Sequence, residues 1–197
     1  NNALVDTNYN IIENNIGTIN RYSSDVTLNE NSGTINTLSK GSVRKNTGKI
    51  NDVDDKNVTI YNYAGGTVGK SDNAWGVRAC TVWNMGGIVQ GYSSYADNVT
   101  VYNFEGGTVS NLRKGSVIYN LGGTVTDSST ARVINCYKVN INSSFVETWN
   151  DKFIINPDTG EVWLPEGETG TFTVKDGTPQ LYVTGATLTK QSDTAYT

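Results

Sequence analysis

Apolar and polar residues alternate in short runs over the first two thirds of the chain. In one such run, Val58 and Ile60 alternate with Thr59 and Tyr61, and Asn62 follows. Because successive side chains of a strand point to opposite faces, this period of two predicts a β-strand. Val58 and Ile60 would point into a core and Thr59 and Tyr61 would point outward, with Asn62 turned inward at the end of the strand.

The same run returns along the chain, and each copy passes through a Gly turn into a second short apolar run. The clearest copies span residues 58–68, 80–89, 99–109 and 116–125, and weaker copies span 26–35 and 42–50. The steps between copies vary from 15 to 21 residues, as the positions of the repeated glycine show: Gly17, Gly33, Gly48, Gly66, Gly87, Gly107 and Gly123. A unit of strand, turn and strand cannot bury its apolar face alone, whereas stacked units share one core. We therefore predict a single-stranded parallel β-solenoid of about seven short coils.

The inward asparagines recur at the same place in the copies. We expect their side chains to form hydrogen bonds along the solenoid and so satisfy the turns, as the buried backbone requires. The expected members of this column are Asn46, Asn62, Asn84, Asn103, Asn120 and Asn135. The glycine that follows would allow a positive φ at the corner.

Composition supports an all-β chain and divides it in two. The sequence holds 25 Asn and 25 Thr against 8 Leu and 8 Ala, so strong helix formers are scarce. Residues 1–142 contain 23 of the asparagines and residues 143–197 contain 2. We predict a parallel solenoid over 1–142, with 1–10 as a cap, and an antiparallel β cap or small β domain over 143–197. Turn signals separate the expected strands of this second part at 152–156, 161–164, 170–174 and 180–183.

Charge and residue types exclude several functions. The net charge is −4, which argues against binding nucleic acid through its phosphates. Without histidine, the chain lacks the usual neutral-pH proton shuttle and the base of a catalytic triad. No apolar stretch is long enough for a membrane span, and no cofactor or metal is expected. Cys80 and Cys136 are expected to be free, buried thiols.

One outward aromatic side chain per coil gives the most suggestive candidate site. We expect Tyr61, Trp83, Tyr102 and Tyr119 to form a stripe with one ring per strand. Nearby turns add further aromatic residues, at Tyr63, Trp75, Tyr92, Tyr95 and Phe104. The stripe is either a structural ladder, a surface covered by another part of the chain, or a flat platform that binds a glycan or a protein.

The other polar clusters suggest weaker alternatives. A column of Thr18, Thr34, Thr67, Thr108 and Thr124, interrupted by Lys49 and Ile88, is a poor match to an ice-binding face. The acidic residues at 51–57 could ligate Ca²⁺, although a solvated turn explains them better. Paired carboxylates for glycoside cleavage are not evident. The charged residues that a β-helix lyase would need are instead dispersed over turns, at Lys70, Asp72, Arg78, Arg113 and Lys114.

The copies of Asn followed by Gly-Gly-Thr-Val resemble the β-helical repeat regions of large bacterial surface and adhesin-like proteins. The resemblance covers about residues 10–142 and implies an exported, extracellular or cell-surface location, with which the Asn- and Thr-rich composition agrees. It implies a non-catalytic module for adhesion, ligand binding or spacing, with a glycan or a host or cell-surface protein as partner. The alternatives are a carbohydrate-active β-helix enzyme and a trimeric phage fibre segment; a monomer is expected for the preferred function.

Overall fold

The computed structural model describes residues 3–6, 11–23, 25, 27–69, 76–91, 97–141, 143–176, 183–184 and 186–197. Within these residues the chain is all-β, and helical structure is limited to one 3-10 turn, Ser143–Phe145. The chain forms two compact units, Asn1–Val133 and Ile134–Thr197. The point of division falls within one long strand, β17 (Arg132–Ile141). The composition-based domain boundary at residue 142 stays a prediction.

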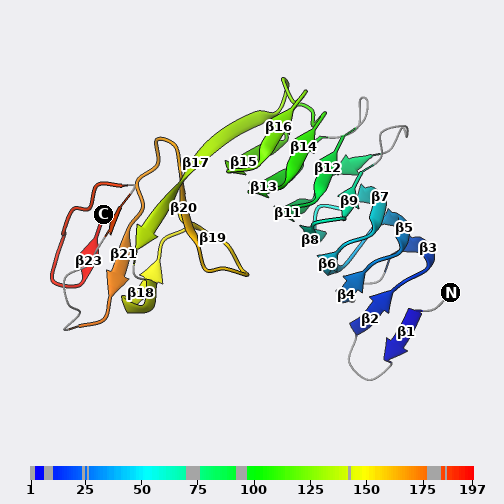
Figure 1. Ribbon diagram of the computed structural model, residues 1–197, viewed down its shortest axis with the longest axis horizontal. Coiled ribbons are helices and arrows are strands. Elements are labelled where there is room, and N and C mark those ends of the chain that lie inside the picture. Colours follow the sequence, from blue (N-terminus) through cyan, green and yellow to red (C-terminus); the bar gives the residue numbers. More distant parts are fainter. Residues whose placement is uncertain are drawn as a thin grey trace. The chain divides into compact units, whose positions relative to one another are not determined.

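The first unit is a parallel β-solenoid, which confirms the predicted fold class. Its strands stack in chain order, coloured from blue to green in Figure 1. One sheet consists of parallel strands in the order β2 (Ile11–Asn15), β4 (Thr27–Asn31), β6 (Ser42–Asn46), β8 (Thr59–Tyr63), β11 (Thr81–Met85), β13 (Thr100–Phe104) and β15 (Val117–Leu121). At its N-terminal edge, β1 (Ala3–Asp6) pairs antiparallel with β2. Residues 1–2 and 7–10 of the expected N-terminal cap lie outside the described residues.

Each strand of the solenoid's second sheet follows one of the repeated glycines. Its parallel strands are β3 (Thr18–Tyr22), β5 (Thr34–Leu38), β7 (Lys49–Asp54), β9 (Thr67–Val68), β12 (Ile88–Gln90), β14 (Thr108–Ser110) and β16 (Thr124–Thr126). Each of these strands starts one residue after a repeated glycine, so all the copies predicted from the sequence form coils. The threonine column lies in register on this sheet, with Lys49 and Ile88 in the same row.

The core between the two sheets consists of columns of aliphatic side chains. The inward residues of the first sheet are fully buried: Leu28, Val43, Ile60, Val82, Val101 and Ile118. Those of the second sheet are equally buried: Ile35, Ile50, Val68, Val89 and Val109. Burial of these β-branched and Leu side chains is the main stabilising term of the solenoid, because a single coil could not remove them from water without its neighbours.

A ladder of asparagines runs along one corner of the solenoid. Each side-chain Nδ2 donates to the Oδ1 of the asparagine in the following coil, at 2.7–2.8 Å from Asn15 to Asn103 and at 3.4 Å from Asn103 to Asn120. The members are Asn15, Asn31, Asn46, Asn62, Asn84, Asn103 and Asn120. The same Nδ2 groups also approach backbone carbonyls of the next turn, for example that of Thr108 at 3.3 Å from Asn84. The expected ladder is therefore confirmed for Asn46, Asn62, Asn84, Asn103 and Asn120.

The ladder differs from the prediction at both ends. Asn135 is exposed, and its backbone carbonyl accepts a hydrogen bond from Glu166 N, so its predicted place in the ladder is wrong. It lies on β17 after the last complete repeat, where the chain pairs with a non-repeating strand. Asn15 and Asn31, by contrast, belong to the ladder although their copies are weak.

The coil from Gly66 to Gly87 carries its extra residues in one place. Ile50 and Val53 of β7 pair with Val68 and Val77, the latter in the short strand β10 (Val77–Arg78). Two residues separate the first pair along the chain and eight separate the second, so this coil holds an insertion of six residues. The glycines that bound it, Gly69 and Gly76, remain attached to β7 by the hydrogen bonds from Gly69 N to Ile50 O and from Gly76 N to Asp52 Oδ1.

The second unit is antiparallel throughout its described strands, as predicted. β17 pairs with β20 (Val162–Pro165) and β22 (Val183–Thr184), and β20 pairs with β19 (Ile154–Ile155). A separate small sheet has the order β18 (Val146–Trp149), β21 (Phe172–Val174) and β23 (Ala195–Tyr196). Residues 180–182 of the last predicted strand lie outside the described residues.

Candidate functional site

The parallel register brings the four predicted aromatic residues into one row. Trp83 pairs with Tyr61 on one side and with Tyr102 on the other, and Tyr102 pairs with Tyr119. We call this row the aromatic stripe. Its position follows from the strand repeat alone, because an outward residue between an inward aliphatic residue and the ladder asparagine falls in the same place in every coil from β8 to β15.

The rings of the aromatic stripe stack on one another along the solenoid. The ring centroids are 6.1 Å apart for Tyr61 and Trp83, 4.3 Å for Trp83 and Tyr102, and 5.1 Å for Tyr102 and Tyr119. The planes differ by only 12–25°. The faces of the inner rings therefore contact other rings, and the edges and polar tips of all four half-buried side chains remain for solvent or a ligand.

A row of hydroxyl groups accompanies the aromatic stripe on the same face. Thr59, Thr81 and Thr100 lie in register two residues before the corresponding aromatic residues. The residues on the other side of the stripe are Tyr63, Met85, Phe104 and Leu121, of which Phe104 and Leu121 are buried. Among these described strands, β8, β11, β13 and β15, no outward side chain carries a charge.

The coils before β8 present a different surface. β4 and β6 each hold two residues between the inward aliphatic residue and the ladder asparagine, where later strands hold one. The register shift falls between β6 and β8. The additional positions are occupied by charged groups, and Lys45 pairs with Glu30 at 3.0 Å. The uncharged aromatic face thus begins at β8.

The acidic residues proposed as an alternative Ca²⁺ site have partners within the protein. Asp54 forms an ion pair with Arg78, Asp52 accepts from Gly76 N at 3.0 Å, and Asp55 accepts from Asn57 N at 2.9 Å. In the part of the chain that the structure describes, no group of three or more His, Cys, Asp or Glu is arranged to hold a metal ion. These carboxylates instead stabilise the turns around β7 and β10.

Among the remaining candidates that the structure describes, Phe104 contacts the stripe, with its ring centroid 6.1 Å from that of Trp83. Arg113 and Lys114 are exposed in the turn after β14. Lys70, Asp72, Trp75, Tyr92 and Tyr95 lie outside the described residues.

Both cysteines are free thiols, as expected. Cys80 is fully buried in the column that Val58 and Val99 also occupy, and Cys136 is half-buried on β17. Burial raises the pKa of each thiol from 9.0 to about 12. Both groups are therefore protonated at neutral pH and lack the thiolate character that a nucleophile needs.

Comparison with known proteins gave no match: no family model, curated protein or solved structure is significantly similar to this chain. None of the described helical segments is long and apolar enough to cross a membrane. The function is therefore inferred from the chain's own geometry.

Proposed function

We propose that the solenoid is a non-catalytic binding module of an exported bacterial surface protein, and that the aromatic stripe with its threonine row binds a glycan. The observation that carries this proposal is the uncharged face over β8, β11, β13 and β15: a row of rings crosses all four strands, and a row of threonine hydroxyls lies beside it on β8, β11 and β13. A contiguous apolar and aromatic patch on a protein surface is typical of binding sites.

The chemistry of this face suits a neutral polyhydroxyl chain that lies along the solenoid. Ring edges supply contact area at a low cost in side-chain entropy, because the stacked rings are already fixed. Thr59, Thr81 and Thr100 each offer a hydroxyl that can both donate to and accept from a sugar hydroxyl. The described outward residues of these strands include no carboxylate, which supports binding without turnover.

The ring stacking favours a second function, that of a structural spacer. Aromatic pairs in contact contribute about 0.5–1.5 kcal/mol beyond their buried area. Three consecutive stacks would therefore stiffen the solenoid even if no ligand binds. Loss of one ring should lower the ligand affinity if the stripe binds a glycan, and should lower only the stability of the solenoid if the stripe is a spacer.

The experiment is a glycan-array screen with the full chain, followed by titration of the best ligand into the Trp83→Ala variant. Loss of a central aromatic anchor should weaken binding by about 1–3 kcal/mol, which is roughly a 5- to 150-fold rise in Kd. The control is Ile88→Ala, since Ile88 is 45% exposed on the other sheet and should leave the affinity unchanged.

Each alternative has its own outcome. Unchanged affinity in Trp83→Ala would place the binding site elsewhere on the protein. If no glycan or protein ligand is found, the structural spacer is the function that the result supports. Turnover of a polysaccharide that disappears with one carboxylate would identify an enzyme. A trimer in size-exclusion chromatography with light scattering would favour the fibre segment.

A further inference from the structure

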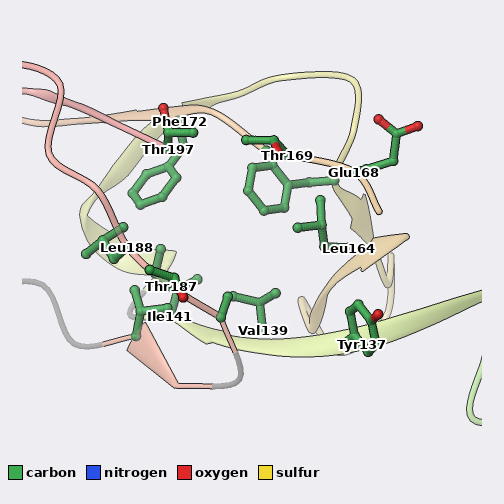
Figure 2. Close-up of a pocket in the computed structure, with 14 residues that line it drawn as sticks. Tyr137, Val139, Ile141, Leu164, Glu168, Thr169, Phe172, Thr187, Leu188 and Thr197 are labelled. Atoms are coloured by element: carbon green, nitrogen blue, oxygen red, sulfur yellow. The ribbon is translucent and has the colours of Figure 1, made fainter. Parts of the chain in front are cut away.

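The second unit contains a pocket that lies entirely within its own strands and that sequence patterns did not indicate. Its volume is about 280 Å³. Val139 and Ile141 of β17 form one wall, Leu164 of β20 and Phe172 of β21 form others, and Leu188 lies beyond β22. In Figure 2 the side chains of Val139, Leu164 and Leu188 stand around an open central space.

The walls of this pocket are packed in place by residues behind them. Phe153 and Phe172 meet edge to face, with centroids 6.2 Å apart and planes at 73°. Trp149 contacts both rings, at 4.9 Å and 5.5 Å between centroids. Val139 and Phe172 are only 6% and 5% exposed. Rings held in this way need no reordering when a ligand enters, so the pocket is preorganised.

The polar groups of the pocket are hydroxyls rather than charges. The carboxylate of Glu168 points away from the central space in Figure 2, and it pairs with Lys152 at 3.1 Å. Thr169 and Thr187 line the pocket and can donate to or accept from a ligand. Because a charged ligand group would lose its hydration here without gaining an opposite charge, the part of a ligand that enters must be neutral.

We propose that this pocket binds a small neutral aromatic compound of one or two fused rings, with one hydrogen-bonding group that reaches Thr169 or Thr187. A cavity of about 150 Å³ lined by Leu, Ile and Phe is enough for benzene, so the larger volume here takes a substituted or fused ring. A ligand ring would extend the edge-to-face cluster of Phe153 and Phe172. This site is separate from the aromatic stripe and does not depend on the function proposed for it.

Indole is the probe for the test, because it is a neutral fused ring with a single N–H donor. Calorimetric titration of indole into the full chain should give saturable binding at one site. Nuclear Overhauser contacts should connect the indole protons to the methyl groups of Leu164 and Leu188. The anion of indole-3-acetate should bind at least about tenfold more weakly, since its carboxylate finds no cation in the pocket.

A filling variant gives the second readout. Leu188→Trp should occupy the pocket with its own indole ring and raise the Kd for added indole about tenfold or more, whereas Ile88→Trp on the solenoid should leave it unchanged. Absence of saturable binding, undiminished binding to Leu188→Trp, or Overhauser contacts to residues outside the pocket would each overturn the proposal. If circular dichroism shows that Leu188→Trp is unfolded, the Overhauser contacts in the unmodified chain decide alone.

Discussion

The later turns of the solenoid each contain two consecutive glycines, and different physical constraints require the first and the second, as Gly106 and Gly107 show. Gly106 has a φ of 79°, a conformation that costs an L-residue energy, yet a Cβ there would meet no atom closer than 3.6 Å. Gly107 lies against the asparagine ladder. A Cβ on Gly107 would lie 2.6 Å from both Asn103 Oδ1 and Asn84 Nδ2. The first glycine is required by its backbone angle and the second by space.

This difference predicts an order of stability for two alanine variants. Gly107→Ala should lower the free energy of unfolding by about 4 kcal/mol, because the new methyl group forces apart a buried hydrogen bond as well as overpacking the corner. Gly106→Ala should lower it by about 1 kcal/mol, through backbone strain alone. Urea denaturation of both variants measures the two values. Equal losses, or the reverse order, would show that the ladder does not limit the second position.

Cys80 gives the folded chain a pH dependence whose sign can be worked out. Its pKa rises from 9.0 to about 12 because burial disfavours the thiolate. Below the unfolded pKa both states hold the proton, so the thiol contributes no pH dependence. Between 9.0 and about 12 the unfolded chain ionises and the folded chain does not, which makes the folded state progressively less stable as the pH rises.

The variant Cys80→Val isolates this effect, since Val58 and Val99 already fill the same column. At about pH 10 the native chain should have lost about 1.4 kcal/mol more stability, relative to neutral pH, than Cys80→Val. Cys136, the tyrosines and the lysines titrate in both proteins and cancel in the comparison. Denaturation midpoints at the two pH values test the prediction, which parallel losses in both proteins would contradict.

At the scale of the element, the six-residue insertion between Gly69 and Gly76 is separable from the coil that carries it. Joining Gly69 to Gly76 by deleting residues 70–75 would restore the spacing of two residues that β7 shows between Ile50 and Val53. We expect the shortened protein to fold with its stability changed by less than about 1 kcal/mol, since loop length affects closure entropy only weakly.

Circular dichroism and thermal unfolding of the deletion variant provide the measurement. Deleting residues 60–65 instead is the matched control, because that change removes most of β8 and its ladder asparagine. The control should not fold to the native spectrum. If the 70–75 deletion also fails to fold to the native spectrum, these residues are required for the stability of the coil and the prediction is wrong.

Strand register and the inward or outward face of each residue were predictable from the sequence, whereas the side-chain rotamers were not. The copies after residue 58 share one length between the inward aliphatic residue and the asparagine, so the rows of the aromatic stripe follow directly. β2, β4 and β6 all carry one additional residue before the ladder position, and of their three ladder members only Asn46 was predicted. Ring stacking depends on rotamers chosen by packing between coils, and a period of two does not encode those rotamers.

At the scale of the whole molecule, the two units differ in how much local pattern determines them. In the solenoid each coil contacts only its neighbours, so one repeat specifies the fold. In the second unit the turn residues predicted the places of β19, β20 and β21, whereas β18 and β23 were not predicted. Partner strands such as β22 and β17, with Asn140 opposite Thr184, are far apart in sequence. The pocket arises from those pairings, which explains why it had no sequence signal.

Every bond in the asparagine ladder points the same way, with the donor in one coil and the acceptor in the next. Each inner coil therefore joins its two neighbours through the same hydrogen bond, as acceptor on one side and donor on the other; we call this contact the joint. Duplication or loss of a gene segment that encodes one whole coil would recreate the joint without any change in the surrounding core. The number of coils can thus evolve independently of the side chains displayed on the outer face, so the length of that face and its chemical character become separately heritable traits.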